Sequence, residues 1–303
     1  MNYEDALIGL ARENPDVAVL TAENRAAIRS LPGELGPQFI DFGIAEQTMV
    51  GAAAGLALRG RVPVVHALAA FLTMRAFEFI RTDVALARLP VFLVGSVPGL
   101  LSDANGPTHQ AIEDVALMRG IPNMTVVCPA DETEMVNALP VLIARRAPSY
   151  LRFNSTAAVD RRHATFEVGR AEVLRDGTDV TILTYGLLVA EAIVAAAILE
   201  ARGVSTAVVN LRTLKPVDDE AIARAAARTP LLVTLEDHLV PGALSSITSE
   251  IMAGRGLRSR LLTIGLHDRW FRPGLLGDVL RFEGLAGEQI AARIHQETKQ
   301  HVH

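Results

Sequence analysis

A carboxylate stands where an apolar strand gives way to a helix of small residues. Residues 38–51 read QFIDFGIAEQTMVG; the run 39–42 has the composition of a short strand, and Gly43 then breaks it. The chain turns helical from Ala45, so Glu46 falls in the first helical turn. The helix dipole favours the ionised form of Glu46 there, whereas apolar neighbours favour the neutral acid. Such a carboxyl group can exchange a proton with a nitrogen base. The alternative is an ordinary acidic residue at a helix start.

Aromatic and basic side chains alternate in the segment 66–86, HALAAFLTMRAFEFIRTDVAL. Phe71 follows a strand-like run and precedes a helix, which predicts a position at the carboxyl edge of a parallel sheet, where ligands bind. Arg75 is interleaved with the aromatic residues, and Phe77 and Arg81 are spaced to share one helix face. Aromatic residues at helical spacing are more often part of the core.

A polar loop after the strand-like run VFLVG contains the third candidate. Thr108 is placed to cap the following helix, so we expect His109 in its first turn. The positive helix end would depress the pKa of His109 and leave a neutral imidazole that can move protons near pH 7. A histidine packed on the loop is the alternative.

Arg152 ends the apparent strand SYLRF and is the fourth candidate. Its planar guanidinium could bind a phosphate or carboxylate, and an interdomain salt bridge is an equally good interpretation.

Composition excludes several classes of protein. The net charge of -5 and pI near 5.9 provide no basic field for nucleic acid. One cysteine, Cys128, leaves no internal disulfide and no multi-cysteine metal site. The N-terminus does not resemble a signal peptide, and no apolar run reaches the length of about 18 residues that a membrane helix needs. We therefore expect a soluble, cytoplasmic protein that binds neither nucleic acid nor a membrane.

The order of apolar runs predicts two α/β domains in series. Strand-like runs (VAVL, QFIDF, VPVVHAL, PVFLVG, MTVVCP) alternate with helical segments, which is typical of a parallel sheet with helices on its faces. Residues 152–178 are polar, and their second half alternates like a hairpin. The α/β pattern then restarts. At 303 residues the chain is long enough for two cores, so we place the domains at 1–165 and 166–303, each a mostly parallel sheet flanked by helices.

Four motifs in order resemble the transketolase family. The segment FIDFGIAEQTMVGAAAGLA resembles its glutamate motif, and GPTHQAIEDVALMRGIPNMTVVCPAD the loop and helix that follow. The segments TYGLLVAEAIVAAAILEARGVSTAVVNLRTLKPVD and LVTLEDHLVPGALSS resemble its last domain. The resemblance covers nearly the whole chain and implies a thiamine-diphosphate pyrimidine-binding fold followed by a transketolase C-terminal domain.

The resemblance also implies roles for single residues. Glu46 matches the glutamate that hydrogen-bonds the aminopyrimidine ring of thiamine diphosphate and favours its imino tautomer, and Phe71 matches the aromatic residue that stacks on the ring. We expect Ile44 and Arg75 to complete this cofactor site. His109 matches the substrate-side histidine and would exchange protons with substrate oxygens.

Further substrate contacts follow from the same resemblance. Arg152 matches an arginine that reaches the sugar phosphate, and His66, near the end of its strand, is a substrate-side candidate with a core position as the alternative. Asn105 stands where relatives have an aspartate that contacts the donor hydroxyl, with Asp103 two residues upstream. The segment TAENRAAIRSLPGEL lacks the Ser/Thr/Lys-rich stretch of many relatives, which puts a phosphorylated substrate in doubt.

One family motif is missing. The family holds the diphosphate and Mg²⁺ of its cofactor through a Gly-Asp-Gly motif in a separate domain, and this chain contains no Gly-Asp-Gly. We therefore expect no metal ligands from this chain and a partner subunit that supplies them. Gly51 and Gly55, flanked by alanines, would allow a close approach of another backbone, although packing within the domain is the competing explanation.

The resemblance thus predicts the C-terminal subunit of a split transketolase, in a heterotetramer of two heterodimers. It would transfer a two-carbon ketol unit from a ketose or α-keto donor to an aldehyde acceptor. Two alternatives are the β subunit of a 2-oxoacid dehydrogenase-like enzyme and a non-catalytic regulatory subunit of the same fold.

Overall fold

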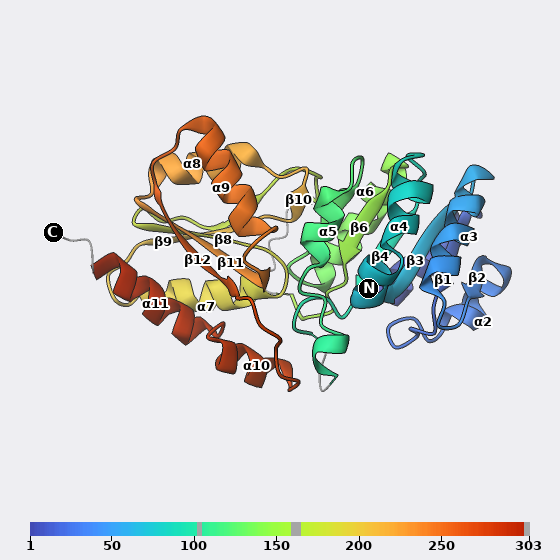
Figure 1. Ribbon diagram of the computed structural model, residues 1–303, viewed down its shortest axis with the longest axis horizontal. Coiled ribbons are helices and arrows are strands. Elements are labelled where there is room, and N and C mark those ends of the chain that lie inside the picture. Colours follow the sequence, from blue (N-terminus) through green and yellow to red (C-terminus); the bar gives the residue numbers. More distant parts are fainter. Residues whose placement is uncertain (102–104, 159–164, 300–303) are drawn as a thin grey trace.

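The computed structural model describes residues 1–101, 105–158 and 165–299. Two α/β domains lie side by side along the long axis, the N-terminal one in blue and green and the C-terminal one in yellow to red (Figure 1). Each has a sheet at its centre with helices on both faces. The two-domain α/β class predicted from the alternating apolar runs is confirmed.

The first sheet has seven strands in the order β10-β5-β6-β4-β3-β1-β2. Its members are β1 (Val17–Thr21), β2 (Phe39–Asp41), β3 (Val62–Leu68), β4 (Phe92–Ser96), β5 (Thr125–Val127), β6 (Ser149–Arg152) and β10 (Thr213–Lys215). Strands β1 to β6 pair in parallel, as their uninterrupted apolar composition predicts, and β10 pairs antiparallel with β5. Because parallel strands share one carboxyl edge, the loops after β1, β2, β3, β4 and β6 gather there.

Helices cover both faces of this sheet, and strand β3 shows why. Its side chains alternate between two apolar clusters, with Val62 and Val64 in one and Val65 and Ala67 in the other. The first face packs against α1 (Tyr3–Glu13), α2 (Leu31–Leu35) and α6 (Glu132–Arg145). The second packs against α3 (Glu46–Leu58), the segment 71–85 and α5 (Asp114–Gly120). Two short helical turns, η1 (Gly36–Gln38) and η4 (Gly106–Thr108), lie in loops.

The segment 71–85 is an interrupted helix. Two π-helical stretches, η2 (Phe71–Arg75) and η3 (Ile80–Ala85), flank the short α4 (Phe77–Phe79). Single π-type turns inside helices often occur at functional sites. Phe77 packs partly against the core, whereas Phe79 is exposed.

The second sheet has five strands in the order β12-β11-β8-β9-β7. These are β7 (Glu172–Arg175), β8 (Val180–Thr184), β9 (Thr206–Asn210), β11 (Leu231–Leu239) and β12 (Arg260–Leu266). Its helices are α7 (Leu188–Glu200), α8 (Asp219–Arg228), α9 (Leu244–Arg255), α10 (Leu276–Glu283) and α11 (Gly287–Lys299). The hairpin predicted in the second half of residues 152–178 is wrong. Strand β7 pairs antiparallel with β9, which separates it from β8, because the turn at Gly177 packs on the backbone of residues 206–207.

The two domains are joined across the predicted boundary at residue 165. Strand β10 comes from the second half of the chain but completes the first sheet, and one apolar cluster continues from β3 to Leu211, Leu214 and Leu244. The division at 165 therefore remains a proposal. Within the described residues, no helix is long and apolar enough to cross a membrane.

Candidate active site

Glu46 occupies the first position of α3 and is almost completely buried, with 2% of its surface exposed. Strand β2 ends at Asp41, whose Oδ1 accepts a hydrogen bond of 2.9 Å from the Gly43 N–H. Gly43 has a φ of +66°, a left-handed conformation that suits glycine and turns the chain into the helix. The buried carboxylate needs a partner, and its Oε2 accepts a hydrogen bond of 2.7 Å from Nη1 of Arg75. No described residue donates to its Oε1.

Two further predicted residues, Phe71 and His109, continue from this ion pair. The guanidinium carbon of Arg75 lies 4.3 Å from the ring centroid of Phe71, one turn earlier in η2. The imidazole of His109 meets the other end of the contact, with ring centroids 5.0 Å apart and the planes inclined at 64°. Carboxylate, guanidinium, phenyl ring and imidazole thus form one chain of contacts, contributed by the start of α3, by η2 and by the loop after η4. Arg75 remains 39% exposed, so the cluster borders the surface.

Ile44 lies two residues before Glu46 and is 72% exposed. This exposed side chain would lower the dielectric constant around a bound ring only if another surface covered the side chain and excluded water. Its predicted place in the cofactor site stays a prediction.

The predicted helical environment of His109 is wrong. His109 follows the three-residue turn η4, and α5 begins only at Asp114, so the histidine is not in the first turn of an α-helix. Thr108 does not cap α5; its Oγ1 lies 2.9 Å from Nδ1 of His109. Pro107 and the left-handed Gly106 (φ +66°) turn the chain here, which favours a tight loop over a continuous helix. The argument from the helix dipole therefore does not apply.

The loop carries two other predicted substrate residues. Asn105 is exposed at the start of η4, and Asp103 lies outside the described residues. Residues of the second domain contact this loop, and the sequence motifs did not predict these contacts. Gln110 donates from Nε2 to the Arg272 carbonyl at 3.5 Å, and Pro273 lies against Gly106.

The surroundings of Arg152 contradict its predicted contact with a sugar phosphate. Arg152 is 3% exposed, and its Nε and Nη1 bind Asp114 at 2.9 Å and Asp237 at 2.7 Å. Asp114 belongs to the first domain and Asp237 to the second, so the alternative interpretation, an interdomain ion pair, is the one the structure supports. The guanidinium is buried and engaged by these two carboxylates.

His66 is fully buried on β3, on the side that faces α1. Its Nδ1 lies 3.2 Å from the hydroxyl of Tyr3, and Phe153 packs edge-on against its ring. Burial lowers the pKa of His66 to about 4, because the protein interior disfavours the charged imidazolium. The residue nevertheless lines a cavity of about 470 Å³, so its predicted substrate-side role stays a prediction.

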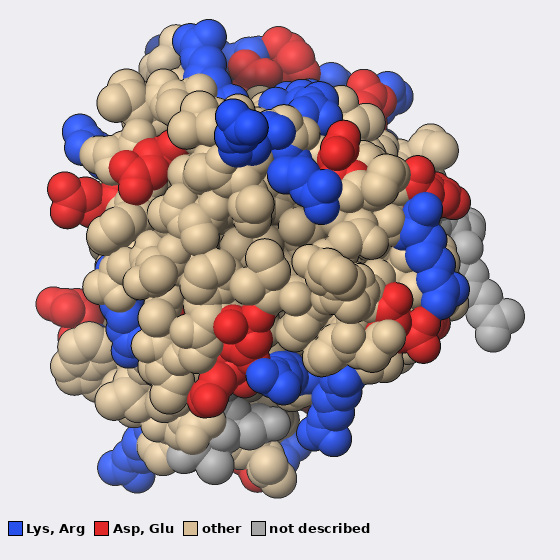
Figure 2. Space-filling model, turned by 90° about the vertical axis from the view of Figure 1, so that its right-hand side faces the viewer, with Lys and Arg blue, Asp and Glu red and all other residues tan. Residues whose placement is uncertain are grey.

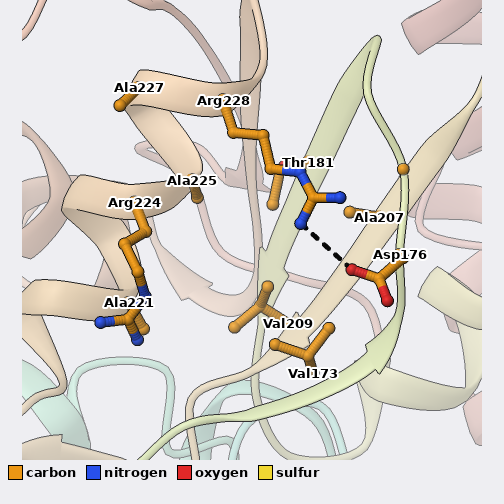
Figure 3. A pocket seen from close by; sticks show the side chains of 11 residues that line it. Val173, Asp176, Thr181, Ala207, Val209, Ala221, Arg224, Ala225, Ala227 and Arg228 are labelled. Atoms are coloured by element: carbon orange, nitrogen blue, oxygen red, sulfur yellow. Dashed lines mark hydrogen bonds and ion pairs between the residues drawn. The ribbon is translucent and has the colours of Figure 1, made fainter.

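A separate cavity of about 380 Å³ lies in the second domain between α8, β7 and β9 (Figure 3). Its lining is mostly apolar, from Val173, Val209 and the alanines of α8, and Arg228 forms an ion pair of 3.2 Å with Asp176 beside it (Figure 3). It contains none of the residues that the sequence predicts for catalysis. Across the described residues, no group of three His, Cys, Asp or Glu side chains is placed to hold a metal ion.

Comparison with known proteins places these features in one family. The family models "Transketolase, pyrimidine binding domain" and "Transketolase, C-terminal domain" match residues 1–158 and 169–290. The chain belongs to the transketolase family. A transketolase C-terminal section from Methanocaldococcus jannaschii is 36% identical over 303 residues, covering 98% of this chain and 95% of the relative.

Two further relatives have nearly the same extent. A 6-deoxy-6-sulfo-D-fructose transketolase subunit from Clostridium sp. strain MSTE9 is 37% identical over 301 residues, covering 98% of this chain and 93% of the relative. A solved structure described as "Split gene transketolase, inactive beta4 tetramer" superposes with a TM-score of 0.89 at 33% identity, covering 98% and 97% of the two chains. The chain therefore corresponds to the C-terminal section of a split transketolase.

Proposed function

We propose that this chain is the C-terminal subunit of a thiamine-diphosphate-dependent split transketolase that transfers a two-carbon ketol unit from a ketose or α-keto donor to an aldehyde acceptor. The observation that carries the proposal is the contact chain from Glu46 through Arg75 and Phe71 to His109, in a transketolase-family chain without a Gly-Asp-Gly motif. We keep the division into a pyrimidine-binding domain (1–165) and a C-terminal domain (166–303) as part of the proposal.

The cluster fits the pyrimidine end of the cofactor. Glu46 offers a buried carboxylate with Oε1 unengaged by described residues, which suits it to hold a proton shared with a ring nitrogen. Arg75 fixes the other carboxylate oxygen and orients the group, while Phe71 offers an aromatic surface for stacking. When bound, thiamine diphosphate supplies the electron sink for breaking and forming the carbon–carbon bond. His109, beside Phe71, would move protons at its ring nitrogens to and from substrate oxygens.

The diphosphate and Mg²⁺ would be held by an N-terminal transketolase subunit, in a heterotetramer of two heterodimers. Helix α3 contains no charged residue other than Glu46 at its start. A helix without a charged face is normally covered by other parts of a protein. Yet Leu58 is 71% exposed, and the face around α3 is largely uncharged (Figure 2). We assign this face, contiguous with the cofactor site, to the partner. The relative whose structure is described as an inactive β4 tetramer agrees with a chain that needs a second kind of subunit for activity.

The substrate is a small sugar or keto compound. Asn105 in place of an acidic residue offers an amide rather than a carboxylate to the donor, and Asp103 remains a candidate contact. One relative is named for a sulfonated sugar, so a specialised pathway is as compatible with this scaffold as central sugar-phosphate metabolism. Arg152 is omitted from the proposed substrate site because it is buried between two aspartates.

A calorimetric titration of thiamine diphosphate with Mg²⁺ tests the split site. We expect no binding to this chain alone and tight binding to the chain mixed with its N-terminal partner. Phe71→Ala should weaken binding to the complex about 2- to 10-fold, as expected from the loss of one stacking contact. Phe282→Ala, at an exposed position in α10, is the matched control and should have no effect. Tight Mg²⁺-dependent binding to the isolated chain would overturn the proposal.

A further inference from the structure

The cavity of about 380 Å³ in the second domain lies between helix α8 and the strands β7, β8 and β9 (Figure 3). Thr181 and Ala207 are each the second residue of their strand, so the cavity lies towards the amino ends of β8 and β9. The carboxyl edge, where an open parallel sheet usually binds its ligands, is at the other end of these strands. The cavity is therefore separate from the cluster around Glu46, and its volume is within the range of small-molecule sites, about 300–1,000 Å³.

Small apolar side chains leave this space open. Ala221 and Ala225 line it from α8 and are 7% and 8% exposed, and Val209 lines it from β9 and is 5% exposed. A contact between a helix and a sheet is normally filled by interdigitating apolar side chains, because protein interiors are close-packed. The alanine methyl groups are too short to fill this contact, so the apolar body of a ligand would gain dispersion contacts that the protein does not make itself. Val173 of β7 is 60% exposed and continues the apolar wall to the surface.

Two arginines of α8 line the cavity beside these alanines. One face of the helix has the spacing i, i+3, i+4 and i+7, with Ala221, Arg224, Ala225 and Arg228. Arg228 forms the ion pair of 3.2 Å with Asp176 that Figure 3 shows at one side of the cavity. Arg224 is exposed and has no ion-pair partner among the described residues. The described lining thus has two guanidinium groups against one carboxylate, in a chain whose net charge is -5.

The apolar wall and the single uncompensated positive charge together define a class of ligand. The planar fork of N–H donors in the Arg224 guanidinium matches the geometry of a carboxylate. A phosphate dianion would bring a second negative charge close to Asp176, and the described lining has no further cation to neutralise it. A sugar would place polar hydroxyl groups against alanine and valine methyl groups that offer them no hydrogen bond.

We propose that this cavity binds a small apolar monocarboxylate, with its hydrocarbon body against the alanines and valines and its carboxylate paired with Arg224. The site gives the second domain a binding function of its own. It does not depend on the proposed ketol transfer, because no residue of its lining belongs to the cluster around Glu46.

Methyl NMR of the full chain with labelled valine methyl groups tests the site without requiring catalysis. The Val173 and Val209 signals are assigned by their loss in Val173→Ile and Val209→Ile. We expect 3-phenylpropionate to shift both signals in a saturable manner. The neutral analogue 3-phenylpropan-1-ol should bind at least about 3-fold more weakly, because it cannot pair with a guanidinium. Acetate, which has no apolar body, should leave both signals unchanged at equal ionic strength. No saturable shift with 3-phenylpropionate, equal affinity for the alcohol, or an equal shift with acetate would overturn the proposal.

Two substitutions separate the contributions of charge and shape. Arg224→Gln should weaken the binding of 3-phenylpropionate about 3- to 10-fold and leave that of the alcohol unchanged, because it removes only the charge. Arg258→Gln, at an exposed arginine of the same domain outside the cavity, is the matched control and should have no effect. Ala225→Leu should abolish the binding of both compounds, because the larger side chain fills the space. Unchanged binding of 3-phenylpropionate in Arg224→Gln would contradict the inference. If Ala225→Leu does not fold, the comparison of Arg224→Gln with Arg258→Gln still decides.

Discussion

Glu46 combines deep burial with a single described partner, Arg75. The ion pair leaves Oε1 available, which is what a proton-exchanging carboxylate needs. Replacing Glu46 by Gln preserves the shape and an acceptor for the hydrogen bond from Arg75 but removes the ionisable carboxylate. We expect the kcat of the assembled enzyme to fall by about 10²- to 10⁴-fold, the usual range for a general acid–base group. The steady-state rate of ketol transfer measures this.

The matched control is Glu78→Gln, at an exposed glutamate of the neighbouring α4. It should leave kcat within about twofold. Equal losses in both variants would mean that Glu46 acts only through the local fold, and a thermal unfolding curve for each variant would show it.

His66 predicts a pH-dependent contribution to stability. Its pKa is about 4 in the folded chain against 6.5 for an ordinary histidine, so between these pH values the unfolded chain binds the extra proton. The contribution is complete above pH 6.5 and is lost as the pH falls towards 4, by about 3 kcal/mol. Glu134 and Glu236 act in the opposite direction, because burial raises their pKa values to about 7.

The contribution of His66 is therefore measured as the difference in the free energy of unfolding between two variants. Urea unfolding of the wild type and of His66→Gln at a series of pH values gives the two free energies of unfolding. Their difference should shrink by about 3 kcal/mol from pH 6.5 to 4. A difference that does not change with pH would show that His66 does not titrate as its burial requires.

Single residues differ in how far the sequence could place them. Glu46, Phe71 and His109 could be proposed as site residues because local sequence motifs contain them, and the structure brings them into one chain of contacts. The error at Arg152 arose because its partners Asp114 and Asp237 lie 38 and 85 residues away in the sequence. The residues next to a strand end do not indicate which part of the chain covers that end. The Tyr3–His66 contact spans 63 residues and has no sequence signal either.

At the scale of elements, α3 has two glycines in surroundings that the described residues leave open. A Cβ at Gly55 would meet nothing within 4 Å, and one at Gly51 would meet only Phe79 Cδ1 at 3.8 Å. Packing inside the domain therefore does not require either glycine, which favours close approach by another chain. Gly55→Met should leave the chain folded, since replacing glycine within a helix stabilises it by up to about 1 kcal/mol, and should weaken assembly with the partner.

Sedimentation of the mixed subunits measures that assembly. Gly254→Met is the control, because Gly254 lies in α9 of the other domain in equally open surroundings. If both variants assemble like the wild type, the partner does not cover α3.

Elements marked by an apolar run were predictable, and those without one were not. Each strand from β1 to β6 lies within an apolar run of the sequence, whereas β10 has no such run and gains its place by pairing with β5, far away in the sequence. Strand β7 alternates as a hairpin strand would, yet it pairs with β9 and forms the edge of the second sheet. Alternation shows that a strand has one buried face but not which strand lies beside it.

At the scale of the whole molecule, the two domains are joined by buried charge. Arg152 pairs with Asp114 and Asp237, and Tyr150 donates its hydroxyl to Asp114 at 2.6 Å. A second buried pair joins Glu134 of the first domain to Arg212 of the second at 3.4 Å. Charges so deep must stay paired. The loop with His109 packs against the same second domain, so the junction also sets the position of the loop.

Arg152→Met tests how much this junction depends on one guanidinium. The change leaves two buried carboxylates without their cation, and breaking a buried pair in this way costs about 3–5 kcal/mol. Arg170→Met removes an exposed pair with Glu167 and should cost under about 1 kcal/mol, which makes it the matched control. Urea unfolding measures both. Similar small losses would mean that water or a neighbouring group compensates Asp114 and Asp237, and that the shared apolar cluster, rather than the ion pair, holds the domains together.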